Sequence, residues 1–258
     1  MTTGLSYNGS VAGTTSYVNQ IATMAVVDST DTAFQTILPQ MITYAENRIY
    51  RDVDFLFTSV SNTSYSITSG SRTISVPSGS NFAGTQWGGG VLVVAEQINL
   101  LTPAGATNPD TSSRVPLLTT TKEFLDAVYG NSSSTGQPKY FCPFDDYTFL
   151  VGPYADATYT VEIVGTYRPA SLSLANPTTF ISLYLPDLFI MASMIYVAAY
   201  QRNFSSAMGN DPQMPVTYEM QYQTLLKSAM SEESRKKWES AAWSSQDTSK
   251  FATPTRGQ

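Results

Sequence analysis

The spacing of the apolar residues predicts helices at the start of the chain. An apolar stripe at helical spacing runs between residues 15 and 27, and a hydroxyl side chain at 14–16 is available to cap its first turn. A second helical pattern begins near Asp31 and has Pro39 in its course, and its spacing predicts one buried stripe of Leu38, Ile42, Ala45 and Ile49. Because proline lacks a backbone N–H and fits the first turn of a helix, we expect a short helical turn and then a main helix that starts at Pro39.

The middle of the chain, from about residue 54 to 175, changes to alternation with a period of two. Gly, Pro, Asn and Ser clusters separate its apolar segments, a pattern typical of strands. This zone therefore predicts an antiparallel β domain, either a sandwich or a small barrel. We expect a hairpin turn at 69–71 and one helix at 120–130. The expected strands are 64–68, 72–76, 91–101, 147–151 and 158–167.

The last third of the chain returns to helical spacing. A helix is predicted at 185–204 with Pro186 and Asp187 in its first turn, where both residue types are favourable. It is apolar nearly all round, so we expect it to be central. A long amphipathic helix follows from about 216 to 243, and we expect its basic run at 235–237 to form a solvated face. From Ser244 onward no periodic apolar pattern remains, which indicates an extended arm.

The order of these zones defines the expected fold class, which is α+β. Two helices precede the β zone and two follow it, so the simplest arrangement is a four-helix bundle from the N- and C-terminal segments with an inserted antiparallel β domain. The expected boundaries are 1–53 for the N-terminal helices, 54–175 for the β domain, 176–243 for the C-terminal helices and 244–258 for the extended C-terminal arm.

Composition narrows the possible partners. The 258 residues carry a net charge of -6, and only 13% are charged, against roughly 25% in an average soluble protein. High-affinity binding to duplex DNA needs many Lys and Arg at the phosphates, so this class is disfavoured. The single cysteine, Cys142, excludes an internal disulfide, and we expect neither a signal peptide nor a membrane span.

The absence of histidine leaves mainly enzyme classes whose chemistry depends on carboxylates. It removes His-dependent catalytic triads and most zinc sites. Asp145 and Asp146 are the most suggestive carboxylate pair for a glycosidase, but they lie between two strand-like runs, where Asp is a normal turn residue. A carbohydrate-binding or carbohydrate-cleaving tail protein, which would use the β zone, stays open as an alternative.

The helix at 38–55 carries Glu46, Arg48 and Arg51 in a chain that otherwise uses few charges. The first interpretation is a solvated helix face with local pairs. The second is that these charges mediate contacts with another molecule, and the pattern alone does not decide between the two.

The order of features along the chain resembles the phage head-to-tail adaptor (connector) family, and is similar to tail tubular protein A of short-tailed phages. The marks that carry the resemblance are AENRIYRDVD at 45–54, TSGSRTISVPS at 68–78, EFLDAVY and TGQPKYF within 123–141, a strand-turn-strand run at 147–172 and LPDLFIMASMIYVAAY at 185–200. The chain differs from the family's pattern in a longer Gly-rich insertion at 79–90 and a long loop at 102–115.

The resemblance implies a structural virion protein at the head-tail junction, made in the host cytoplasm. Such adaptors form a homo-oligomeric ring, commonly a dodecamer, under the portal protein, extend the DNA channel and offer a platform to the downstream tail or nozzle protein. It implies no enzyme activity, no cofactor, no metal and no membrane, and DNA would pass through the lumen without specific binding. A different virion ring component, such as a nozzle or head-closure subunit, is a third option, but helices at both chain ends favour the adaptor.

Two sets of residues are candidates under this resemblance. Glu46, Arg48 and Arg51 would form ion pairs between neighbouring subunits and fix their register. Lys250, Phe251 and Arg256 would dock the C-terminal arm onto the portal, for example by adding a strand to an exposed sheet edge. The net acidity, repeated around a ring, would repel DNA phosphates from the lumen.

Overall fold

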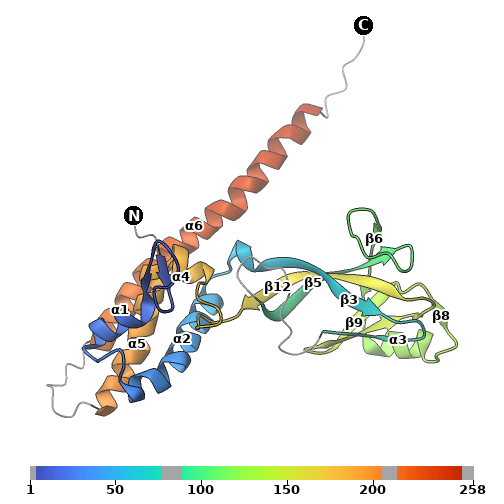
Figure 1. Cartoon of the computed structure of the whole chain (residues 1–258). Coiled ribbons are helices and arrows are strands. Elements are labelled where there is room, and N and C mark those ends of the chain that lie inside the picture. Colours follow the sequence, from blue (N-terminus) through green and yellow to red (C-terminus); the bar gives the residue numbers. More distant parts are fainter. Residues whose placement is uncertain (1–3, 77–88, 205–213, 252–258) are drawn as a thin grey trace, which may run out of the picture. The chain divides into compact units, whose positions relative to one another are not determined.

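The computed structural model describes residues 4–76, 89–204 and 214–251 (Figure 1). This part of the chain is α+β, as predicted, and holds six α-helices. It divides into two compact units, one of residues 1–56 with 171–258 and the other of residues 57–170. The second unit is inserted in the first and carries both four-stranded sheets, and the expected bounds of the β domain were 54–175.

The described part of the first unit contains five helices and one pair of short strands. It is therefore not the simple four-helix bundle that we predicted, because α4 and a parallel pair of strands, β1 and β2, are added to it. Helix α5 packs against α1, α2, α4 and α6 and so occupies the central position expected for it. The elements are β1 (Gly4–Ser6), β2 (Thr14–Ser16), α1 (Tyr17–Ala25), α2 (Thr32–Asp52), α4 (Phe180–Tyr184), α5 (Pro186–Phe204) and α6 (Met214–Phe251).

Helix α2 begins earlier than the sequence suggested. The carboxylate of Asp31 accepts the backbone N–H groups of Ala33 and Phe34, each at 3.4 Å, and so caps a helix that starts at Thr32. Pro39 lies inside this continuous helix, so the prediction that the main helix starts there is wrong. The cap accepts hydrogen bonds from the first amides of the helix, and this stabilisation offsets part of the cost of the one backbone hydrogen bond that proline removes.

The core of the first unit forms around α2 and α5. The apolar stripe of α2 predicted from its spacing is fully buried. Tyr17 of α1 stacks on Phe189 of α5 with ring centroids 4.7 Å apart, and its hydroxyl donates to Ser193 at 2.6 Å. Burial raises the pKa of the Tyr17 phenol well above its ordinary value. The stripe consists of Leu38, Ile42, Ala45 and Ile49.

Helix α6 is longer than predicted. It continues to Phe251, so the segment 244–251, which we expected to be extended, is helical. The physical reason is that this segment contains neither glycine nor proline, and the first helix-breaking residue after it is Pro254. Residues 252–258 of the expected arm lie outside the described residues.

The inserted unit consists mainly of two four-stranded sheets. All five predicted strands are present, and pairing is antiparallel in both sheets except between β7 and β9. The predicted helix is α3 (Lys122–Tyr129), capped by Thr121. One sheet has the order β3 (Ser59–Ile67), β12 (Tyr159–Pro169), β5 (Gly90–Thr102), β6 (Ser113–Pro116); the other has β4 (Thr73–Ser75), β10 (Thr148–Gly152), β9 (Tyr140–Asp145), β7 (Leu118–Thr119); β8 (Thr135–Gly136) pairs with β11 (Tyr154–Ala155).

The chain passes between the two four-stranded sheets several times, and backbone hydrogen bonds fix two of these crossings. The turn at 69–71 is not the predicted hairpin, because β3 and β4 belong to different sheets. Gly70 adopts a φ of 74°, and its N–H donates to the carbonyl of Ala155 at 2.7 Å, which stabilises the crossing. At the second crossing Leu117 donates to Ile98 of β5, and the next residue, Leu118, donates to Lys139 beside β9. Both sheets share one apolar core, to which β3, β4, β5, β9, β10 and β12 contribute.

Candidate assembly interface

Glu46 of α2 lies inside the first unit rather than on its surface. Its side chain is 1% exposed. Both carboxylate oxygens accept the backbone N–H of Leu172 at 3.2 Å, and the hydroxyls of Thr179 and Ser171 also donate to the carboxylate. The local reason is the flanking position of Glu46 beside the apolar stripe, which turns it toward the segment that returns from the inserted unit.

The charge of Glu46 has no cationic partner among these contacts. Burial therefore raises the pKa of the carboxyl group to about 7, while the hydrogen bonds from Ser171, Leu172 and Thr179 oppose the shift. Near neutral pH the group is present in both protonation states. A side chain in this position has no exposed surface to offer a neighbouring subunit, so Glu46 does not fit the predicted role in an ion pair between subunits.

Arg48 connects α2 to α6. Its guanidinium donates two hydrogen bonds to the carboxylate of Glu219, at 2.9 and 2.6 Å, and lies 4.3 Å from the centroid of the Tyr222 ring. The hydroxyl of Tyr222 in turn donates to Asp52 at 2.6 Å. This planar, two-pronged pairing is the geometry for which arginine is suited. Arg48 thus stabilises the packing of two helices of the same chain.

Arg51 is the exposed member of the three predicted residues. Its Nε donates to the carbonyl of Asn47 one turn earlier, at 3.0 Å. Tyr44, seven residues earlier on the same side of α2, is also exposed and leans on Tyr196 of α5, with ring centroids 5.7 Å apart. Of the three charges predicted to lie at a subunit interface, Arg51 is the one placed to contact another molecule.

A second buried carboxylate fixes the segment that leads out of α2. Glu233 of α6 accepts the backbone N–H of Leu56 at 3.1 Å and the ammonium group of Lys236 at 2.7 Å. Lys237 forms an ion pair with Asp54, also in this segment. Two members of the basic run 235–237, which we expected to form a solvated helix face, therefore have acidic partners within the first unit.

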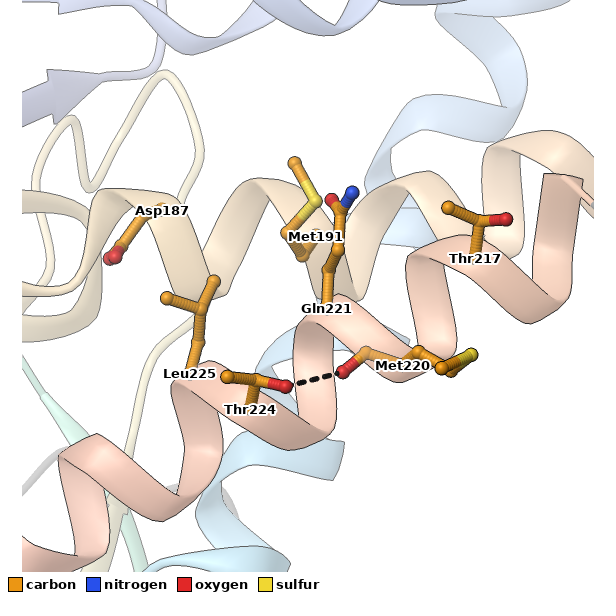
Figure 2. A pocket seen from close by; sticks show the side chains of 7 residues that line it. All are labelled: Asp187, Met191, Thr217, Met220, Gln221, Thr224 and Leu225. Carbon is orange, nitrogen blue, oxygen red and sulfur yellow. Dashed lines mark hydrogen bonds between the residues drawn. The ribbon is translucent and has the colours of Figure 1, made fainter.

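An open groove lies between α5 and α6 (Figure 2). Its volume is about 560 Å³, and its lining is mostly apolar. Asp187 and Met191 of α5 face Met220, Thr224 and Leu225 of α6 across it. Met220 is 68% exposed, an unusual state for a long apolar side chain, and Asp187 is the charged residue among the lining residues that the structure describes.

The inserted unit has its own polar cluster around Glu162 of β12. This buried carboxylate accepts from Ser61 of β3, Asn99 of β5 and Arg114 of β6, at 2.8, 2.9 and 2.8 Å. Burial by itself would raise the pKa of Glu162, but these hydrogen bonds and the Arg114 charge outweigh it and lower the pKa. The cluster connects all four strands of one sheet and has a structural role.

The carboxylate pair considered for sugar chemistry is part of a turn. Asp145 accepts the backbone N–H of Tyr147 at 2.8 Å, as a turn aspartate does, and both Asp145 and Asp146 are exposed. Within the described parts of the chain, no three His, Cys, Asp or Glu side chains gather where they could bind a metal ion. Among the helices described, none has the length and hydropathy needed to cross a bilayer.

The residues predicted to dock the portal fall at the end of α6 and beyond it. Lys250 and Phe251 fall in the last turn of α6, and Arg256 lies outside the described residues. The Gly-rich insertion at 79–90 also lies outside them as far as residue 88. Its described end, Gly90, begins β5.

The chain combines a helical unit with an inserted β unit. Its buried and paired charges described above stabilise its own packing, and the apolar groove between α5 and α6 stays open. These are features of a structural assembly protein. The chain matches the SU10 adaptor protein family over residues 15–249, nearly its whole length, and it belongs to this family. Its role is therefore that of a structural adaptor, a component of the phage virion. The narrower likeness to tail tubular protein A stays a prediction. A comparison with curated proteins gives no match.

The sequence did not reveal the partners of the predicted residues. Glu219 and Tyr222, which hold Arg48, lie on α6 some 170 residues away. The one available signal was their spacing of three on an amphipathic helix, which places them on the same face. The sequence indicated the groove more weakly, because Met191 and Met220 lie in predicted helices, where a buried position explains a methionine equally well.

Proposed function

We propose that this chain is the subunit of a head-to-tail adaptor ring. Copies of the chain, commonly twelve, assemble under the portal protein, extend the DNA channel and provide the attachment platform for the downstream tail or nozzle protein. The observation that carries this proposal is the family match over residues 15–249. The two-unit architecture supports it, because a helical unit and an inserted β unit offer separate surfaces for separate partners.

Within the ring, Arg51 is our candidate for an ion pair between neighbouring subunits. Its exposed position on α2 supports this role. Glu46 and Arg48 then act indirectly, since their hydrogen bonds stabilise the helix that presents Arg51.

The C-terminal residues Lys250, Phe251 and Arg256 are our candidates for docking on the portal. A cationic and aromatic end suits an acidic or apolar groove on another protein. The net charge of -6 per subunit supports a second element of the proposal, an acidic lumen along which DNA slides without binding. A basic lumen in the assembled ring would refute that element.

The test is to mix the purified full-length chain, and a version that ends at Ser245, with the portal protein encoded by the same phage. The mass of the particles and their composition are then measured by native mass spectrometry. We expect the full-length chain to add several copies to each portal and the shortened chain to add none. No association of either chain with the portal would overturn the proposal.

A carbohydrate-binding tail protein is the alternative class. The turn role of Asp145 speaks against a glycosidase in which Asp145 and Asp146 act as the pair. A rise in melting temperature with saccharides would favour carbohydrate binding, and release of sugar products would favour cleavage.

A further inference from the structure

Two exposed faces of the first unit differ in shape and charge. One is the groove between α5 and α6, which is apolar and carries Asp187. The other is the outer face of α2, where Tyr44 is 52% exposed and Arg51 lies two turns further along the same side. The first face is hollow and acidic, and the second carries a projecting ring and a cation.

Helix periodicity places the groove on the side of α6 that points away from α2. Residues on a helix are separated by about 100° of rotation. Tyr222 and Glu219 point toward α2, since they contact Asp52 and Arg48. Met220 is two positions before Tyr222 and is therefore turned by about 160° from it.

Helix α5 shows the same division between its two sides. Tyr196 contacts Tyr44 of α2, whereas Met191, five positions earlier, points into the groove. In Figure 2 the lining side chains come from α5 and α6, and pale blue ribbon lies behind these two helices. The hollow acidic face and the projecting basic face therefore lie on nearly opposite sides of the helical unit.

A closed ring of many identical copies places a requirement on the surfaces of each subunit. Each subunit must offer two different, complementary faces related by a small rotation, because a contact between identical faces closes after two copies. The ring proposed above needs such a pair of faces on every chain.

We infer that the groove between α5 and α6 receives the α2 face of a neighbouring copy. Tyr44 of the neighbour inserts between Met191 and Met220, and its Arg51 pairs with Asp187 at the rim. This inference rests on the ring assembly proposed above and names the surfaces that form it. Flexible methionine side chains adapt to an inserted aromatic ring, and arginine pairs well with a carboxylate at the edge of an apolar contact.

The occupant is a second copy because the charges of the chain match each other. Among the described residues of the groove lining the charged group is the negative Asp187, and Arg51, two turns from Tyr44 on the same side of α2, is positive. Each contact is weak by itself, but the same contact repeats at every interface of a closed ring, so small changes at one face alter the assembly strongly.

The experiment compares ring formation on the portal by five variants, one of them a control, with that by the wild-type chain. Asp187→Arg and Arg51→Asp place like charges together, and each should lower the ring yield by at least about fivefold. The double variant restores an opposite-charge pair and should recover most of the yield. Met220→Glu should also lower the yield, since it places a charge where Tyr44 enters. Asp110→Arg, an exposed reversal in the inserted unit, is the matched control and should leave the yield unchanged.

The outcomes separate this inference from the proposed function. All substituted positions are exposed, and circular dichroism melting of the free chains checks that each variant is folded. If the wild-type chain forms a ring, and both single charge variants and Met220→Glu form it with the same yield, this inference is wrong but the proposed function stands. A lower ring yield of both single charge variants, without recovery of the yield in the double variant, would overturn the pairing of Arg51 with Asp187. Absence of a wild-type ring would overturn the proposed function and this inference with it.

Discussion

Both carboxylate oxygens of Glu46 lie 3.2 Å from the backbone nitrogen of Leu172, a residue 126 positions further along the chain. Leu172 is the second residue after the inserted unit ends. Glu233 makes the corresponding contact with Leu56, the last residue before the inserted unit begins. Two buried carboxylates of the helical unit therefore fix both segments through which the chain leaves and returns.

The stability of the helical unit should fall as pH rises through the titration of Glu46. The pKa of this group is raised in the folded chain to about 7 from an ordinary value of 4.5, so the folded state binds its proton more tightly than the unfolded state does. The stabilisation is complete below about pH 4.5 and is lost as pH approaches 7. The shift corresponds to at most about 3 kcal/mol of unfolding free energy.

Glu46→Gln isolates this effect, because the amide keeps the shape and one acceptor oxygen but does not titrate. Urea unfolding of both chains between pH 5 and 8 measures it. We expect the stability difference between wild type and variant to shift in favour of the variant as pH rises. Parallel pH profiles for the two chains would show that Glu46 does not titrate differently on folding.

Arg48 and Arg51 should respond differently to the same conservative change. Arg48→Lys removes the two-pronged contact with Glu219 and should lower the free energy of unfolding by about 1 kcal/mol. This loss of stability is small because Glu219 is partly exposed. Arg51→Lys, on the exposed side of the same helix, is the matched control, and we expect less than about 0.5 kcal/mol. Equal effects on thermal unfolding would contradict the roles assigned to the two residues.

Glu162 should be important for the stability of the inserted unit. Glu162→Ala leaves donors of Ser61, Asn99 and Arg114 without their acceptor, and this should cost about 2–4 kcal/mol. Glu96→Ala provides the control, because Glu96 is exposed on a neighbouring strand and accepts a single hydrogen bond from Thr166. Chemical denaturation of both variants measures the difference. Similar stabilities would mean that the Glu162 cluster contributes little.

Gly165 of β12 should not tolerate a side chain. A Cβ atom at this position would lie 2.1 Å from the carbonyl oxygen of Val94 on β5, at a point where the strand register shifts. Gly165→Ala should therefore destabilise the inserted unit by about 2–4 kcal/mol. Gly105→Ala is the comparison, because Gly105 has a positive φ but open space around it, and we expect about 1 kcal/mol. A mild effect at Gly165 would indicate that β5 can move aside.

The elements that the sequence predicted well are those with a strong local signal. The stripe at Leu38, Ile42, Ala45 and Ile49, the Pro-Asp start of α5 and the alternating strands all depend on periodicity and capping, which act over a few residues. The start of α2 was missed because the Asp31 cap outweighs the usual preference of proline for the first turn.

Long-range pairing explains the remaining errors. The turn at Gly70 resembles a hairpin locally, yet each flanking strand finds a better partner elsewhere, β12 for β3 and β10 for β4. Glu46 was predicted to lie at an interface because of the family resemblance, and the helix pattern places it only at the border of the apolar stripe. Its burial depends on a segment beginning at Ser171, and no local pattern reports that contact.

The measurement that tests the central claim most directly is electron microscopy of the full-length chain mixed with the portal protein, with the rotational symmetry of the added density determined. We predict a closed ring of this chain below the portal, with helical units in contact around it and an open channel on the axis. Portal particles without added density, or density that does not close around the axis, would contradict the assignment of this chain as a ring-forming adaptor.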